Sequence, residues 1–122
     1  MSYQLIWTEK GVTADFKGIV NNFELREIVS KFYGSSKFDE INYLIINLLH
    51  VDKFDATDRD LLSVGAMDSV AAISNPKIRV AVISNDEDIL NLFTSYEEGS
   101  AGSPWKVKYF SSVNHANKWL LA

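Results

Sequence analysis

The sequence predicts one α/β domain over residues 1–122, a single-domain sandwich in which about four helices pack on a central, mostly parallel sheet. Two apolar runs, INYLIINLL at 41–49 and IRVAVI at 78–83, are typical of strands buried on both faces. A segment with helical spacing follows each run, and strands that alternate with helices imply right-handed parallel crossovers. Alternating residues near the N-terminus add an antiparallel hairpin. A chain of 122 residues, 47% of them hydrophobic, suits one core.

The first elements have clear boundaries in the sequence. Residues 3–7 alternate in polarity, a turn follows, and residues 12–16 alternate again, which predicts the hairpin. The first helix begins after Asn21, with Glu24 as its capping-box partner, and Gly34 is a natural stop. We therefore expect the antiparallel edge of the sheet to lead into a helix.

The second helix is expected to begin at Thr57, after a polar segment at 50–56, and to end at Asn75-Pro76. Helical spacing predicts that one stripe faces the sheet: Leu62, Gly65, Ala66, Ser69, Val70 and Ile73. The small residues in this stripe predict a close approach of the helix to the sheet.

The last third of the chain repeats the pattern. Ser84 and Glu87 form a predicted capping box for a third helix that reaches Tyr96. A Gly/Ser-rich loop at 99–104 precedes a strand at 105–110, and Ser111-Ser112 opens a last helix. The loop lacks the glycine spacing of phosphate-binding loops and precedes a strand instead of a helix, so we expect a simple connection.

The amino-acid composition argues against several classes of function. Twelve basic and sixteen acidic residues give a net charge of −4, which opposes the phosphate attraction used by nucleic-acid-binding proteins. The absence of cysteine excludes disulfides, thiolate nucleophiles and cysteine-ligated metals. No apolar run is long enough to span a membrane and the N-terminus has no signal-peptide pattern, so we expect a cytoplasmic protein.

No catalytic constellation or metal site is predicted. His50 and His115 are far apart in the sequence and accompany no nucleophile motif. Four carboxylates, Asp52, Asp55, Asp58 and Asp60, lie close together, but their spacing is not that of a calcium loop, and a solvated helix-capping turn is the simpler interpretation. We expect no cofactor and no metal.

The turns after the three parallel strands are the candidate functional surface. They comprise residues 55–58, Ser84-Asn85-Asp86 and Ser111-Ser112. Open α/β sheets place their ligand crevices at the carboxyl ends of strands, so we expect these turns to lie along one edge of the sheet.

The chain resembles the SpoIIAA-like group, within the wider set that includes STAS domains and Sec14-like lipid-binding domains. The resemblance covers almost the whole chain and is carried by four stretches: YQLIWTEKGVTADFKGIV, INYLIINLLHVDKFDATDRDLL, KIRVAVISNDEDILNLF and WKVKYFSSVNHANKWLL, the last with the pattern Ala116-x-x-Trp119-Leu120. It implies the SpoIIAA-like fold and a regulatory function.

The resemblance also implies a site. In STAS anti-sigma-factor antagonists an Asp-Ser-Ser-Gly turn carries a phosphorylated serine. Here Asp55 matches the aspartate and Thr57 falls at the hydroxyl, whereas Ala56 and Asp58 depart from the pattern. Thr57 is thus a candidate phosphosite, but the residues themselves favour a structural N-cap with Asp60, and nearby carboxylates oppose a phosphate.

Three functions remain in order of preference. The leading hypothesis is a non-enzymatic regulatory domain that binds a protein partner through Asp55, Thr57 and Asp58 and the adjacent face of the second helix. The alternative is a carrier of a small apolar ligand or lipid in a cavity between sheet and helices. An enzyme comes third. The many aromatic residues, expected to lie mostly in the core, also leave open a homodimer through exposed members of that set.

Overall fold

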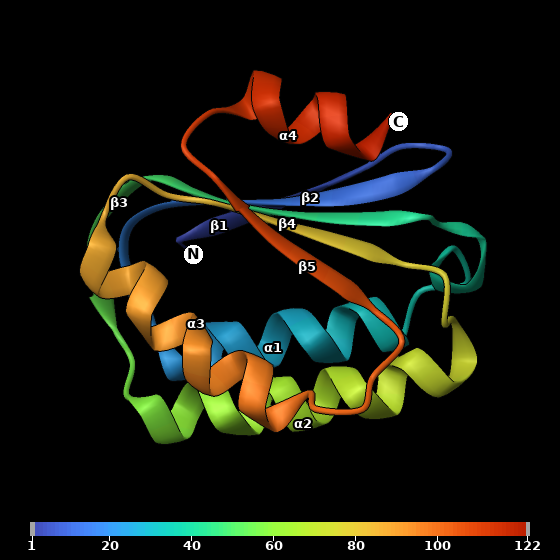
Figure 1. Ribbon diagram of the computed structural model, residues 1–122, viewed down its shortest axis with the longest axis horizontal. Helices are drawn as coiled ribbons and strands as arrows, with labels where there is room; N and C mark the ends of the chain where they lie inside the picture. Colours follow the sequence, from blue (N-terminus) through green and yellow to red (C-terminus); the bar gives the residue numbers. More distant parts are fainter. Residues whose placement is uncertain (1, 122) are drawn as a thin grey trace.

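A computed structural model describes residues 2–121 (Figure 1). The elements in chain order are β1 (Tyr3–Trp7), β2 (Gly11–Asn21), α1 (Asn22–Tyr33), the short 3-10 helix η1 (Phe38–Glu40), β3 (Tyr43–Asp55), α2 (Asp58–Ser74), β4 (Arg79–Ile83), α3 (Glu87–Gly99), β5 (Lys106–Phe110) and α4 (Val113–Leu120).

The strands form one sheet in the order β1-β2-β3-β4-β5. β1 and β2 are antiparallel and every other neighbouring pair is parallel, which confirms the predicted fold class. Helices α1, α2 and α3 lie on one side of the sheet and α4 lies on the other (Figure 1). Within the helical layer α2 lies below α1 in that view, and α3 descends obliquely to the level of α2.

The sheet separates two apolar cores. The main core lies between the sheet and α1, α2 and α3, and a smaller one lies under α4 around Ile45, Ala81, Ile83 and Ala116. Successive residues of β3 and β4 point into opposite cores, as the pleat requires. This confirms the prediction that both strands are buried on both faces.

β3 is longer than the sequence predicts. It continues to Asp55, so the segment at 50–56, expected to be a polar connection, is mostly strand. The reason is β2, which is also long and pairs with this extension from Lys17 opposite His50 to Asn21 opposite Asp55. Irregularities in the pairing flank Gly18, whose φ of +74° favours glycine.

The predicted caps are right for three helices and wrong for one. Asn21 and Glu24 form the capping box of α1, and Ser112 accepts a hydrogen bond from the amide of His115 at the start of α4. At α3 the cap is Asp86, whose side chain accepts from the amides of Asp88 at 2.9 Å and Ile89 at 3.4 Å. The Ser84–Glu87 box is therefore wrong. Thr57, the cap of α2, belongs to the site below.

The orientation predicted for α2 is also wrong. Its buried residues are Leu61, Val64, Gly65, Asp68, Ala71 and Ala72, whereas most of the predicted stripe faces solvent. Leu62, Val70 and Ile73 are 43%, 61% and 82% exposed. The close approach made possible by Gly65 is to α3, because a Cβ at this position would overlap the carbonyl oxygen of Tyr96.

Candidate functional site

The structure brings two of the three predicted turns together. The amide of Ser84, after β4, donates to the carbonyl of Phe110, at the end of β5, at 3.1 Å. The turn after β3 lies apart, because β4 ends at Ile83, which is opposite Asn47, and β3 continues from there to Asp55. The prediction of one surface made by all three turns is wrong, and residues 55–58 form a site of their own beside α1 and α3.

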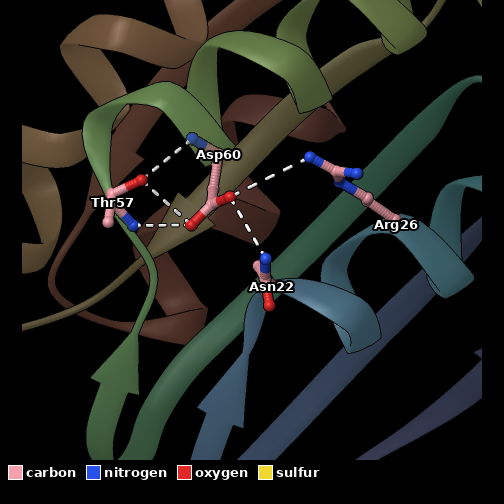
Figure 2. A network of polar contacts seen from close by, with 4 residues as sticks. All are labelled: Asn22, Arg26, Thr57 and Asp60. Carbon is pink, nitrogen blue, oxygen red and sulfur yellow. Dashed lines mark hydrogen bonds and ion pairs between the residues drawn. The ribbon is translucent and has the colours of Figure 1, made fainter.

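Thr57 is the N-cap of α2 (Figure 2). Its hydroxyl oxygen accepts from the amide of Asp60 at 3.3 Å, and its own amide donates to Oδ2 of Asp60 at 2.9 Å. The Thr57 hydroxyl also donates to Oδ2 of Asp60, at 3.0 Å. These contacts form a capping box that satisfies backbone amides at the start of the helix.

Asp60 joins this cap to the first helix. Its other carboxylate oxygen, Oδ1, accepts from Nδ2 of Asn22 at 3.2 Å and lies 3.9 Å from the guanidinium of Arg26 (Figure 2). The hydrogen bond from the Thr57 amide is the main cause that lowers the pKa of Asp60, and the other donors act in the same direction. A carboxylate with a lowered pKa stays ionised and holds the starts of α1 and α2 together.

The outer side of the turn is solvent-exposed. Asp55, Thr57, Asp58 and Arg59 are all exposed, and Asp58 accepts a hydrogen bond from Ser95 of α3 at 3.3 Å. In contrast to Asp60, Asp55 and Asp58 direct their charge mainly to solvent.

Phe23 is a site residue that sequence reasoning missed. It lies in the first turn of α1, next to Asn22, and is 78% exposed, whereas the aromatic residues were expected to lie mostly in the core. Its position beside the polar Asn22 at the helix start was the available signal, because the apolar spacing of α1 is satisfied by Leu25, Ile28, Val29 and Phe32. Phe23 thus exposes an apolar ring in the first turn of α1, the helix whose Asn22 contacts Asp60.

Within residues 2–121 no three His, Asp or Glu side chains gather as metal ligands would. The acidic residues of this region are divided between the cap, the exposed turn and the long strand β3.

A second polar feature lies inside the main core. Asp68 of α2 is 7% exposed, and Oδ2 of its carboxyl group accepts from the hydroxyl of Tyr96 at 2.6 Å. Oδ1 has no hydrogen-bond partner among the described residues. Burial raises the pKa of Asp68 to about 7, although the Tyr96 hydrogen bond acts against this rise.

Asp68 lines a small cavity between the sheet and the three helices. The cavity has a volume of about 40 Å³, and its other walls are apolar except for Tyr96, with Phe16, Leu44 and Phe93 among them. A cavity of about 150 Å³ is known to admit benzene, so this one has room for only a few atoms.

The two histidines lie on the side of the sheet opposite to α1, α2 and α3. His50 is exposed on β3 beside Lys17 and borders a shallow hollow with Gln4 and Asp15. His115 is exposed on α4. The structure therefore does not bring either imidazole to the turn at 55–58.

The fold is that of SpoIIAA. The chain is similar to the anti-sigma factor antagonist SpoIIAA in its unphosphorylated form, with a TM-score of 0.63, 11% identity and coverage of 98% of this chain and 97% of the other. It is also similar to the phosphorylated form of the Bacillus cell-fate determinant SpoIIAA, with a TM-score of 0.59, 16% identity and coverage of 96% and 98%.

A third similar structure is an uncharacterized DUF3478-family protein with a SpoIIAA-like fold from Shewanella loihica PV-4. Its TM-score is 0.52 at 16% identity, with coverage of 97% of this chain and 91% of the other. The sequence matches no protein-family model and no curated protein. At these identities the likeness establishes the SpoIIAA-like fold. Among residues 2–121, none of the helices has the length and apolar character required to cross a membrane.

Proposed function

We propose that this chain is a non-enzymatic regulatory domain that binds a protein partner through a docking turn, defined as Asp55, Thr57 and Asp58. The observation that carries the proposal is the contrast around Asp60. The hydrogen bonds of Asp60 hold the starts of α1 and α2 in place, while Asp55, Asp58 and Arg59 are exposed, as is the ring of Phe23 in the first turn of α1. A fixed surface that combines an exposed aromatic ring with charges suits protein recognition.

The fold supports a regulatory function. The similar SpoIIAA structures are those of an anti-sigma factor antagonist, a protein that acts on another protein. The docking turn follows β3 and opens α2, which is the place that the sequence resemblance assigns to the regulatory turn. The proposal therefore transfers the general role, protein binding, and leaves the partner of this chain to experiment.

The proposal includes a specific mode of regulation, the phosphorylation of Thr57. A phosphate would remove the proton that Thr57 donates to Oδ2 of Asp60 and would add about −1.5 to −2 charges beside that carboxylate. The capping box would then break, and the contact between α1 and α2 through Asp60 would weaken. Phosphorylation would act by releasing the start of α2.

The docking turn can be tested by capture of partners from an extract of the source organism, followed by quantitative mass spectrometry. We expect Asp55→Ala/Asp58→Ala to reduce recovery of a specific partner by about tenfold or more, the range expected when an interface anchor is lost. Asp15→Ala/Lys17→Ala, on the opposite side of the sheet, is the matched control and should leave recovery unchanged. Equal recovery with both double variants would refute the docking turn.

The alternative, a carrier of a small apolar ligand or lipid, has one observation in its favour, the cavity beside Asp68. A volume of about 40 Å³ is far below that needed for a lipid chain. Protein binding is therefore the function we carry forward, and a carrier would have to enlarge its core on binding.

A further inference from the structure

The outward face of α2 carries no charge over most of its length. From Leu61 to Pro76 the single charged residue is Asp68, which points into the core. The exposed side of the helix is made of Leu62, Ala66, Val70 and Ile73, with Ser69 at its margin. Surface helices normally present charged or polar residues on this side, and a continuous apolar face on the outer surface indicates an interface.

The surface beside this face is hollowed. Ser69, Ala72 and Ile73 of α2 border a shallow hollow whose other wall is the loop Ala101–Pro104. The hydroxyl oxygen of Ser69 is shielded from solvent and has no hydrogen-bond partner within residues 2–121. Apolar side chains and a receiving hollow thus lie on the same surface of one molecule.

We propose that a second copy of this chain covers this face, with the two α2 helices antiparallel across a twofold axis. A twofold interface requires a patch that complements itself. An axis midway along the face places Leu62 of each copy opposite Ile73 of the other, and Ala66 opposite Ser69. The large side chains of one half of the face then lie over the hollow of the other half, and small residues meet at the axis, where two helices can approach closely.

The charges at the ends of the face agree with this arrangement. Asp58 and Arg59 lie exposed at the N-terminal end of α2, whereas Lys77 and Asp39 lie exposed beyond its C-terminal end, where the Lys77 ammonium donates to the carbonyl of Asp39 at 3.2 Å. An antiparallel pair brings Asp58 of one copy toward Lys77 of the other and Arg59 toward Asp39. A parallel pair would instead place Asp58 beside Asp58 and Lys77 beside Lys77.

The dimer face and the docking turn share only Asp58, which lies at the end of the face. The centre of the α2 face lies around Ala66 and Ser69, whereas Asp55 and Thr57 lie at the start of α2 and Phe23 lies in the first turn of α1. A dimer through α2 would therefore display two docking turns, one on each copy.

Sedimentation velocity over a concentration series tests the dimer. We expect the wild-type chain to dimerise reversibly, and Ile73→Glu to raise the dissociation constant by about 100-fold or more, since every dimer contains the change twice. Ile19→Glu is the matched control: Ile19 is 62% exposed, but on β2, so its dimer should persist. Circular dichroism checks that both variants fold.

The register has its own test, because the natural chain contains no cysteine. An equimolar mixture of Leu62→Cys and Ile73→Cys chains, oxidised gently, should form the mixed disulfide faster than Ile19→Cys chains crosslink with one another, because both side chains are exposed and lie opposite each other in the proposed register. A wild-type chain that stays monomeric up to about 1 mM, or Ile73→Glu that dimerises as well as wild type, would overturn the proposal. Crosslinking no faster than the Ile19→Cys control would overturn the antiparallel register.

Discussion

The carboxyl group of Asp68 lies in the main core, with the phenol of Tyr96 as its hydrogen-bond donor. Because burial raises its pKa to about 7 from an unfolded value near 3.9, the folded chain binds this proton more tightly than the unfolded chain does. The stabilisation is complete below about pH 4 and is lost as the pH rises through about 7. We expect Asp68 to lower the free energy of unfolding by roughly 2–4 kcal/mol between pH 4 and pH 8.

Asp68→Asn should flatten this part of the profile, because the amide keeps an acceptor for Tyr96 and does not ionise. Urea unfolding at several pH values measures the effect, and the variant should exceed the wild type in stability at pH 8. Asp60 and Glu24 have lowered pKa values, so their contributions to stability are lost only on acidification. They therefore do not mimic the loss of stability that Asp68 causes as the pH rises. Asp58→Asn, an exposed counterpart on the same helix, should follow the wild-type curve. Parallel curves for Asp68→Asn and the wild type would contradict the prediction.

Helices α2 and α3 touch through two glycines. A Cβ at Gly65 would overlap the carbonyl oxygen of Tyr96, and one at Gly99 would overlap the carbonyl oxygen of Leu62. Since both obstacles are backbone atoms, Gly65→Ala must push the helices apart and disturb the bond between Tyr96 and Asp68. We expect a loss of about 1–3 kcal/mol, typical of overpacking, measured by urea unfolding.

Gly34→Ala is the matched control for Gly65→Ala. Gly34 has a φ of −75°, which any residue adopts, and the nearest atom to an added Cβ is the Ser30 carbonyl oxygen at 3.3 Å. Its stability should stay within about 0.5 kcal/mol of wild type. If Gly65→Ala is equally harmless, α2 and α3 are not held at this close separation.

Helix α2 shows where prediction from the sequence succeeds and where it fails. The order of strands and helices follows from the spacing of apolar residues along the chain. The continuous apolar run of β4 is typical of a buried strand, whereas the single apolar stripe of α1 is typical of a helix packed on one side, so the two patterns are not confused. In α2, Leu61 and Val64 on one side and Leu62 and Val70 on the other are equally apolar, so periodicity does not select the buried side. The charge of Asp68 then favours the wrong choice, because a buried carboxylate requires the tertiary partner Tyr96.

At the candidate site, too, some contacts could be predicted from the sequence and others could not. The box between Thr57 and Asp60 is local in sequence and could be predicted from residues three apart. The contacts of Asp60 with Asn22 and Arg26 join segments more than thirty residues apart, and no local pattern indicates them. The length of β3 is likewise set by its pairing with β2, which sequence spacing alone does not reveal.

The two cores share one sheet, and this determines how the molecule as a whole should unfold. Ile45 and Ile83 face α4 on strands whose neighbouring residues, Leu44 and Val82, face the main core. Loss of the α4 side therefore removes support from the same strands that hold the main core. We expect a single cooperative transition, in which tryptophan fluorescence and far-ultraviolet circular dichroism coincide, because Trp7 and Trp105 border one core and Trp119 the other.

Trp119→Ala tests this coupling. The ring packs on Phe110 with a centroid separation of 5.7 Å, and the guanidinium of Arg79 lies 5.6 Å from its centre. Its removal should lower the free energy of unfolding by about 2–4 kcal/mol, at or below the range for fully buried tryptophans because this one is half-buried. The urea midpoint should fall while the slope stays constant, and His115→Ala, exposed on the same helix, should change neither. An early, separate loss of helix signal in Trp119→Ala would mean that α4 unfolds alone and that the shared strands do not couple the two cores.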